Sequence, residues 1–253
     1  MKEYLSICSQ AALDAGKEIL EVYQSDFEVI EKNDASPLTL ADQKAHQVIV
    51  KYLEETNIPI LSEEGKNINY SERSKWDTFW LVDPLDGTKE FIKKNGEFTV
   101  NIALIKNGIP IMGVIYVPVN DILYYGYEDK AIKIEEFSLG NSNEVSLPLD
   151  IKKPFTLVGS RSHMSKETED YFNEMKSVHG KVEIISVGSS LKLCMVAEGK
   201  ANVYPRYAPT MEWDTAAGHA IVKASGHEVY NVETKSPLTY NKSNLLNPWF
   251  IVK

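Results

Sequence analysis

The sequence predicts a layered fold in which an α+β first half is followed by an α/β second half. Three observations support this prediction: two helical patterns open the chain, strand-like runs follow them, and strands then alternate with helices beyond residue 139. With 253 residues and 43% hydrophobic content, the chain is long enough to bury a substantial core.

Apolar residues at helical spacing predict a first helix near the N-terminus. They are Leu5, Cys8, Ala12, Ala15, Ile19 and Val22. A second helix is expected from about Leu40 to Glu55, with Thr39 as its N-cap and Asp42 three residues further on.

Apolar runs separated by turn residues then predict a sheet in the first half. The runs cover residues 79–82, 98–105, 109–118, 121–127 and 131–136. The segment 139–153 is polar and rich in turn residues, so we place the join between the two halves there, dividing the chain into 1–138 and 139–253.

Strand and helix patterns alternate in the second half. The expected strands lie at 156–159, 182–188 and 201–205, and the expected helices lie near 165–177, 191–199 and 213–224.

Composition limits the classes of function. A formal charge of -9 argues against binding of a nucleic-acid polymer, because the summed field repels polyphosphate. The N-terminal pattern carries too many polar residues for a signal peptide, and the most apolar stretch, 109–119, is too short and interrupted to span a membrane. The two cysteines, Cys8 and Cys194, are expected to be reduced core residues.

The motif with the clearest chemistry is Trp80-Leu-Val-Asp-Pro-Leu-Asp-Gly-Thr88, an apolar strand that runs into two carboxylates. Pro84 restricts the turn and Gly87 permits a left-handed backbone, so Asp83 and Asp86 can face one point beyond the strand. Hard cations such as Mg²⁺ prefer these oxygen ligands.

Other interpretations of this motif are an ordinary Asp-Pro/Asp-Gly loop, an EF-hand and an aspartyl-phosphate phosphatase. The EF-hand fits poorly, because Leu85 and Gly87 cannot supply side-chain oxygens. The aspartyl-phosphate phosphatase fits poorly, because its two aspartates lie two residues apart, whereas Asp83 and Asp86 lie three apart.

Two further acidic positions favour a cation site. The pair Glu63-Glu64 directly follows an apolar run, and Asp214 lies at the start of a helix rich in small residues. Each also has an ordinary explanation, as a solvated loop for the pair and as a helix cap or dipole partner for Asp214.

Taken in order, these three motifs resemble those of the lithium-sensitive, magnesium-dependent phosphatases of the inositol monophosphatase superfamily, and the resemblance spans essentially the whole chain. It implies an αβαβα sandwich whose first half carries most metal ligands and whose second half carries Asp214 and most substrate contacts. It also implies two or three Mg²⁺ ions per active site. Glu63, Asp83 and the carbonyl of Leu85 would hold one cation, and Asp83, Asp86 and Asp214 would hold a second.

The resemblance also assigns catalytic roles to Thr88 and Asp42. In this family pattern a cation activates the attacking water without a covalent enzyme intermediate. Thr88 would hydrogen-bond that water, and Asp42 would accept the Thr88 proton. The alternative for Asp42 is the third position of a capping arrangement with Thr39, and the two roles are compatible.

Within the superfamily, several sequence segments resemble those of the 3'(2'),5'-bisphosphate nucleotidases of the CysQ type. These segments are Thr88–Phe91, Asn95–Ile105, Ser160–His163, Gly188–Lys192 and Tyr204–Arg206. A nucleoside bisphosphate carries a second phosphate, which needs cations and donors beyond the metals, and Gly188 with Ser189 would offer donors at a helix start.

The resemblance therefore implies a set of substrate contacts. They are Glu63, Leu85, Asp86, Gly87, Thr88, Ser160, Arg161, His163, Gly188, Ser189, Lys192, Arg206 and Asp214. A basic residue taken alone is more often a surface charge, and the alternative for His163 is a helix cap.

The implied reaction is hydrolysis of the 3'-phosphate of adenosine 3',5'-bisphosphate to AMP and phosphate, with its sulfated analogue as a further substrate. This reaction would clear a by-product of sulfate assimilation in the cytoplasm, with inhibition by lithium. Association with the inner membrane face and the choice between monomer and homodimer stay open. The alternatives are an inositol monophosphatase or fructose-1,6-bisphosphatase of the same superfamily, and a non-catalytic nucleotide or metal sensor.

Overall fold

A computed structural model describes residues 1–24, 29–31, 37–140, 143–159 and 165–253 of the 253-residue chain. Its central element is a seven-stranded sheet with the order β3-β4-β5-β6-β7-β8-β9. The strands are β3 (Ile60–Ser62), β4 (Thr78–Asp86), β5 (Thr99–Lys106), β6 (Ile109–Val117), β7 (Ile122–Tyr127), β8 (Lys130–Glu135) and β9 (Val145–Ser146). β3 pairs with β4 in parallel, and all other neighbours pair antiparallel.

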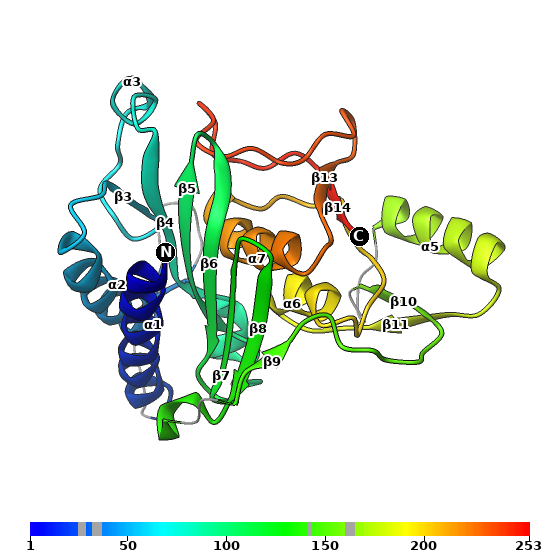
Figure 1. Cartoon of the computed structure of the whole chain (residues 1–253), viewed down its shortest axis with the longest axis horizontal. Coiled ribbons are helices and arrows are strands. Elements are labelled where there is room, and N and C mark those ends of the chain that lie inside the picture. Colours follow the sequence, from blue (N-terminus) through cyan, green and yellow to red (C-terminus); the bar gives the residue numbers. More distant parts are fainter. Residues whose placement is uncertain (25–28, 32–36, 141–142, 160–164) are drawn as a thin grey trace.

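Helices cover both faces of this sheet (Figure 1). α1 (Lys2–Tyr23) and α2 (Leu40–Glu54) pack on one face through a core that includes Trp80, Val82 and Ile102. α6 (Leu191–Ala197) and α7 (Glu212–Ala224) pack on the other, against the strand residues that alternate with these.

Two glycines allow α7 to lie directly on the sheet. A Cβ atom added at Gly113 on β6 would lie 2.2 Å from the Ala217 carbonyl oxygen, and one at Gly126 on β7 would lie 2.5 Å from the Ile221 Cα. Any larger side chain at either position would push α7 away from the strands. The close approach therefore fixes where α7 lies, and with it the position of Asp214 in its first turn.

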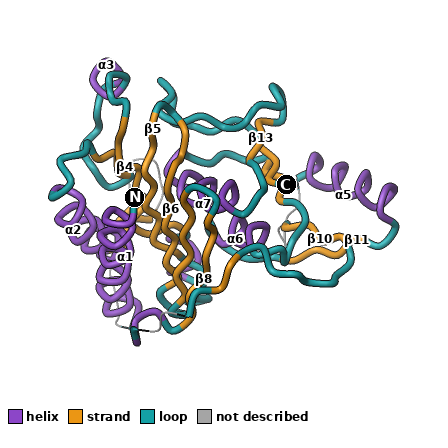
Figure 2. Tube along the Cα trace, in the orientation of Figure 1, coloured by secondary structure: helices purple, strands orange, loops and turns teal. Residues whose placement is uncertain are grey.

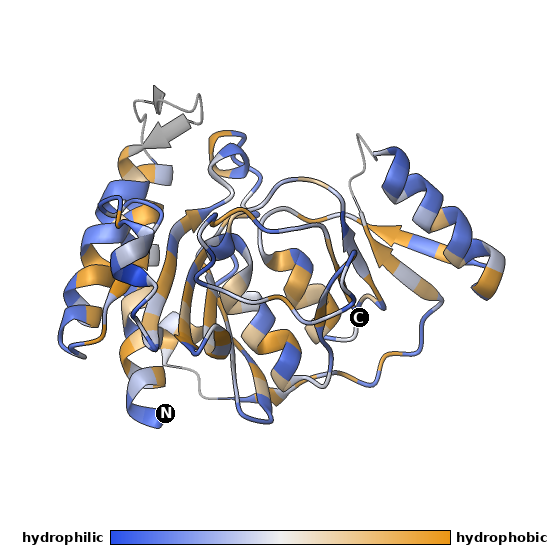
Figure 3. Cartoon of the chain, turned by 90° about the horizontal axis from the view of Figure 1, so that it is seen from above, coloured by the Kyte–Doolittle hydropathy of each residue, from blue (hydrophilic) through white to orange (hydrophobic). Residues whose placement is uncertain are grey.

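A second set of β-strands lies beyond α6 and α7. β10 (Phe155–Val158) pairs in parallel with β11 (Val182–Ile185), and a three-stranded sheet has the order β12 (Tyr204–Arg206), β14 (Phe250–Val252), β13 (Val229–Asn231). α5 (Lys166–His179) forms the outermost layer (Figure 1) and has no buried residue. It is mostly hydrophilic in Figure 3, whereas the strands and inner helices carry the apolar residues.

The layers run α1/α2, large sheet, α6/α7, small sheets and α5, so the predicted αβαβα sandwich is confirmed. Expected elements agree with observed ones to within one to three residues at most ends. The division of the chain at residue 139 stays a prediction. The expected cap residue Thr39 has a side chain outside the part of the structure that is described.

Several short elements were not predicted from the sequence. They are α3 (Tyr70–Arg73), α4 (Thr88–Ile92), the 3₁₀ turn η1 (Phe137–Leu139), β1 (Val29–Glu31), β2 (Pro37–Thr39), β3, β9, β13 and β14. Figure 2 shows that most of the connection between β13 and β14 is loop. Short elements carry too few residues for a periodic pattern, which explains why they were missed.

Candidate active site

The predicted cation motif lies at the end of β4, where the strand register changes. Asp83 pairs with Asn101 and Asp86 with Thr99 on β5, with an irregularity between the two pairs. Gly87 follows with φ +94°, a left-handed conformation of the kind that glycine permits, and α4 begins at Thr88. The bulge and the left-handed turn thus end the strand immediately after both aspartates.

Asp83 lies at the electrostatic centre of the site. The residue is 2% exposed, and its Oδ1 accepts a hydrogen bond from the Leu85 N–H at 3.1 Å. Burial raises the pKa of Asp83 well above its ordinary value, and Coulomb repulsion from neighbouring acids raises it further. These neighbours are Glu63, Asp86, Asp214 and Asp42, so four predicted site acids lie close enough to affect it.

Asp86 is held by the start of α6. Its Oδ2 accepts hydrogen bonds from the Ser189 hydroxyl at 2.6 Å and from the Ser190 N–H at 2.5 Å. Desolvation raises the pKa of Asp86, while the hydrogen bond from Ser189, the positive charge of Lys192 and the Ser190 N–H oppose that shift. This contact joins the motif to a segment more than 100 residues later in the chain.

A polar pair on β5 holds the same serines. The Thr99 hydroxyl lies 2.7 Å from the Ser189 hydroxyl and 2.8 Å from the Ser190 hydroxyl. The Ser190 hydroxyl donates to the side-chain oxygen of Asn101 at 2.7 Å. Thr99 and Asn101 are two residues apart and buried, so they lie on one face of the strand. These two residues were not predicted as site residues. Two polar residues spaced two apart inside an apolar strand could have indicated a buried polar contact.

Asp214 lies in the first turn of α7, where its Oδ2 accepts the Met211 N–H at 2.9 Å. Burial and the negative charge of Asp86 raise the pKa of Asp214 to about 8, although the Met211 N–H opposes the shift. A helix N-terminus favours an ionised carboxylate, so burial, together with the charge of Asp86, outweighs the effect of the helix start at Asp214. The predicted capping interaction and proximity to the other acids therefore coexist.

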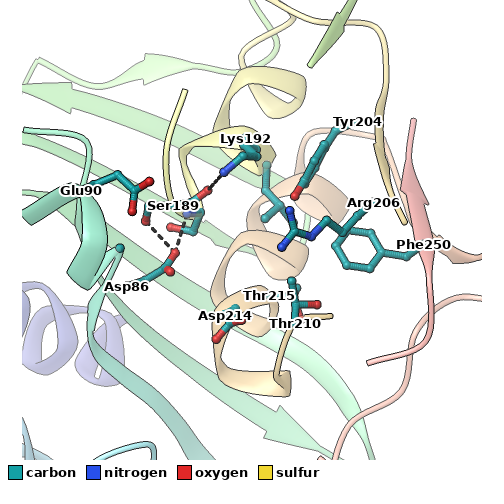
Figure 4. A pocket seen from close by; sticks show the side chains of 13 residues that line it. Asp86, Glu90, Ser189, Lys192, Tyr204, Arg206, Thr210, Asp214, Thr215 and Phe250 are labelled. Atoms are coloured by element: carbon teal, nitrogen blue, oxygen red, sulfur yellow. Dashed lines mark hydrogen bonds between the residues drawn. The ribbon is translucent and has the colours of Figure 1, made fainter. Parts of the chain in front are cut away.

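A cavity of about 240 Å³ opens beside these acids (Figure 4). Of the predicted site residues, it is lined by Asp86, Gly87, Ser189, Lys192, Arg206 and Asp214.

Two of these lining residues, Lys192 and Arg206, are basic. Burial lowers the pKa of Lys192, the negative charge of Asp86 opposes this shift, and the positive charge of Arg206 adds to it. Lys192 Nζ donates to the Ser189 carbonyl oxygen at 3.2 Å, and Arg206 Nη2 donates to the Pro209 carbonyl oxygen at 3.1 Å. The cavity thus combines acids on one side with two basic groups on the other.

The two predicted catalytic residues lie beside the same acids. Asp42 is 3% exposed in the first turn of α2, and its charge acts on Asp83. Thr88 is the first residue of α4, and its hydroxyl points toward the Leu85 carbonyl oxygen at 3.5 Å. Glu63 directly follows β3 and its side chain is exposed. Ser160, Arg161 and His163 lie outside the described residues.

The Gly188 turn contacts protein carboxylates. The Gly188 N–H donates to the Glu97 carboxylate at 2.7 Å, and the Ser189 hydroxyl and the Ser190 N–H donate to Asp86. Binding of a substrate anion by Gly188 and Ser189 stays a prediction. An Asp and a Glu satisfy a helix start for the same reason that a phosphate does, so sequence could not tell the two apart.

Seven residues that line the cavity were not predicted as site residues. They are Glu90, Ser190, Leu193, Tyr204, Thr210, Thr215 and Phe250. Burial raises the pKa of Tyr204 to about 12, and the nearby charge of Arg206 opposes the shift. Glu90 and Tyr204 lie in two of the segments that carry the family resemblance, so the sequence offered a basis for predicting these two as site residues.

The donor set fits a hard divalent cation. The acids around Asp83 are all oxygen donors. Burial, and after it repulsion from neighbouring acids, raises the pKa values of Asp83 and Asp214, and a bound cation would offset both effects. In the described part of the chain, no three His, Cys, Asp or Glu side chains stand close enough to enclose a cation as they are placed.

Comparison with known proteins places this fold and site in a class of phosphatases. A model of the inositol monophosphatase family matches residues 1–248, so the chain belongs to the inositol monophosphatase family. It is therefore an enzyme of the phosphatase class, and phosphatases of this family depend on metal ions. The resemblance noted in the sequence is confirmed.

Within this family, the chain is similar to proteins named CysQ. The chain is 46% identical over 248 residues to the 3'(2'),5'-bisphosphate nucleotidase CysQ of Escherichia coli (strain K12), covering 96% of each. It is 45% identical over 242 residues to the corresponding protein of Buchnera aphidicola, covering 94% of this chain and 87% of that one. The crystal structure of CysQ from Bacteroides thetaiotaomicron superimposes with a TM-score of 0.91 at 53% identity, covering 100% of this chain and 97% of that one.

Among the described helices, none combines the length and apolar character needed to cross a bilayer.

Proposed function

We propose that this protein hydrolyses the 3'-phosphate of adenosine 3',5'-bisphosphate to give AMP and phosphate, with Mg²⁺ as its cofactor, and that it also accepts the sulfated analogue. The observation that carries the proposal is the cavity in which acids adjoin Lys192 and Arg206. One side can hold cations against the phosphate that is cleaved, while the basic side can bind the phosphate that is kept.

The relatives support the same substrate class, because the proteins with 45–46% identity over nearly the whole chain are named 3'(2'),5'-bisphosphate nucleotidases. A chain with a net charge of -9 repels phosphate esters at long range. A phosphate pocket in this chain therefore needs positive charge close to the ligand. The acid cluster would supply it by binding metal cations, and Lys192 and Arg206 supply it with their own side chains.

Glu63, Asp83, Asp86 and Asp214 would hold the cations through their carboxylates, with the Leu85 carbonyl as a further oxygen ligand. When bound, Mg²⁺ supplies charge neutralisation of the phosphoryl oxygens and lowers the pKa of water. Asp83 would contribute to both cations, and its proximity to the charges of Glu63, Asp86, Asp214 and Asp42 supports this assignment.

Thr88 and Asp42 would manage the proton of the attacking water. The Thr88 hydroxyl lies next to the Leu85 carbonyl, and Asp42 is a buried carboxylate beside Asp83. A threonine hydroxyl is too weak an acid to ionise alone, so it needs an acceptor such as Asp42 to orient its lone pair toward water. Such a proton relay has no use in a protein that only binds its ligand.

Phosphate release distinguishes this function from its relatives in the family. We expect Mg²⁺-dependent, lithium-inhibited release from adenosine 3',5'-bisphosphate with a higher kcat/KM than from inositol 1-phosphate or fructose 1,6-bisphosphate. A higher kcat/KM for either of these two compounds would reject the nucleotide assignment. Binding of the nucleotide without any turnover in Mg²⁺ would instead favour a sensor.

Replacing Lys192 by Met should weaken selectivity for the second phosphate. We compare kcat/KM for adenosine 3',5'-bisphosphate with kcat/KM for adenosine 3'-monophosphate, which lacks the 5'-phosphate. The ratio should fall by about 10- to 100-fold, because a hydrogen bond to a charged group contributes about 1.5–3 kcal/mol.

The matched control is Lys181→Met, which removes a lysine paired with Glu183 on the surface. This variant should keep the wild-type ratio. If Lys192→Met lowers kcat/KM equally for both nucleotides, Lys192 does not bind the second phosphate.

A further inference from the structure

The start of α7 is anchored by a buried carboxylate that is not a predicted cation ligand. Glu212, the first residue of the helix, is fully buried. Its carboxylate accepts the N–H groups of Asn241 at 2.6 Å and Lys242 at 3.0 Å, and the Lys242 ammonium at 2.5 Å. Three donors on one loop therefore bind a residue two positions before Asp214.

The same loop, residues 241–247, also binds the backbone that leads into α7. The Asn247 side-chain amide donates to the Met211 carbonyl oxygen at 2.8 Å, and the Glu212 N–H donates to the Leu245 carbonyl oxygen at 2.9 Å. Met211 in turn gives its N–H to Asp214 Oδ2. The loop thus fixes the residue that orients the Asp214 carboxylate.

Arg73 on α3 holds this loop from its other side. The residue is 3% exposed, and its Nη1 donates to the Asn241 side-chain oxygen at 2.8 Å and to the Lys242 carbonyl oxygen at 2.6 Å. Its Nη2 donates to the Ser243 carbonyl oxygen at 3.0 Å, and the Asn241 amide returns a bond to the Arg73 carbonyl oxygen at 2.7 Å.

These contacts are unusual for a buried arginine. Its acceptors here are neutral oxygens of one short segment about 170 residues later in the chain, and its Nε has no hydrogen-bond partner in the described structure. Burying a guanidinium without a carboxylate partner costs folding free energy. We therefore infer that the forked donor groups of Arg73 serve to hold that segment in place.

We propose that Arg73 is a positioning residue for cation binding, acting through loop 241–247 and Glu212 to orient the Asp214 carboxylate. The inference rests on the proposed role of Asp214 as a cation ligand. Partners that orient metal ligands from outside contribute to affinity although they never touch the ion. Arg73 thereby links a short helix next to the large sheet to the cation site at the start of α7.

The test measures cation binding directly, by calorimetric titration of Mg²⁺ and by the electron paramagnetic resonance signal of free Mn²⁺. Arg73→Met should weaken affinity about 10-fold or more, the usual loss when such a supporting group is removed. Glu212→Gln should shift affinity in the same direction, and Arg73→Lys, which keeps the charge but not the fork, should lie between wild type and Arg73→Met. At saturating Mg²⁺ we expect kcat to recover to nearly the wild-type value.

Glu198→Gln is the control for general destabilisation. Glu198 is also a fully buried carboxylate, with Lys200 at 2.7 Å and the Tyr124 hydroxyl as partners. It caps the C-terminal end of α6 and does not line the cavity. This variant should lower the unfolding temperature and leave cation affinity unchanged.

The outcomes separate the inference from the proposed function. If Asp214→Asn weakens cation binding but Arg73→Met, Arg73→Lys and Glu212→Gln all bind as wild type, the positioning role is overturned. If Asp214→Asn itself binds cations normally, the ligand assignment fails first. Should Arg73→Met not fold, the comparison of Arg73→Lys and Glu212→Gln with Glu198→Gln decides the question.

Discussion

Asp83→Asn is expected to lower kcat on the order of 10³-fold, because several kcal/mol of cation-derived transition-state stabilisation would be lost. Asparagine keeps the volume of the side chain but removes the charge that would bind two cations. The measurement is the steady-state rate with adenosine 3',5'-bisphosphate over a range of Mg²⁺ concentrations. Added Mg²⁺ should not restore the rate.

The same substitution should raise the stability of the metal-free protein. Asp83 and Asp214 have raised pKa values in the folded state, so the folded chain binds more protons than the unfolded one. Stability from these groups is therefore present at low pH and lost as the pH rises from near 3.8 to about 8, the window given by Asp214. Without Mg²⁺, the unfolding temperature of the wild type should therefore fall more steeply with rising pH across this window than that of Asp83→Asn.

Mg²⁺ should stabilise the wild type at pH 8 and have little effect on Asp83→Asn, because ligands stabilise the state that binds them. Asp77→Asn is the control, since Asp77 is exposed just before β4 and is not near the acid cluster. Near-normal turnover in Asp83→Asn, or equal stabilisation of both proteins by Mg²⁺, would contradict the cation assignment.

The parts of the site that sequence predicted share a local cause. Asp83, Asp86 and Gly87 lie in one short motif, where an apolar strand, a proline and a glycine determine the backbone, so the left-handed turn at Gly87 followed from the sequence. Strands and helices of the two halves were predicted for the same reason, since each carries its own periodicity. The meeting of Asp214 with this motif came from the family resemblance, because spacing along the chain says nothing about a contact across 130 residues.

The parts that sequence missed depend on contacts between distant segments. Thr99 and Asn101 were interpreted as members of a strand and of a segment that carries the family resemblance, but not as site residues, yet they contact Ser189 and Ser190, which bind Asp86. Gly188 has the composition of an anion-binding turn, but the structure places the Glu97 carboxylate on its N–H. The loop at 241–247 carries no periodic pattern, and its role depends on Arg73, which the sequence places far away.

Thr88→Ala is expected to lower kcat by about 10²- to 10⁴-fold, the range for lost proton-transfer assistance, while leaving Mg²⁺ affinity close to that of the wild type. Thr88 begins α4 and is only partly buried, so removal of its hydroxyl should cost little stability. Thr88→Ser is the matched control, since it restores the hydroxyl and should recover most of the rate. Rates and calorimetric Mg²⁺ titrations of the three proteins check this prediction.

The partner carboxylate gives a sharper test of the same step. Asp42→Asn should lower kcat by a similar factor, and the double variant with Thr88→Ala should lose little more than either single variant, because two groups that act as one unit are not additive. Losses that multiply would show that Asp42 and Thr88 act independently, with Asp42 serving only the start of α2. An unchanged kcat in Thr88→Ala would remove Thr88 from the reaction altogether, leaving the cations and Asp42 to activate water without it.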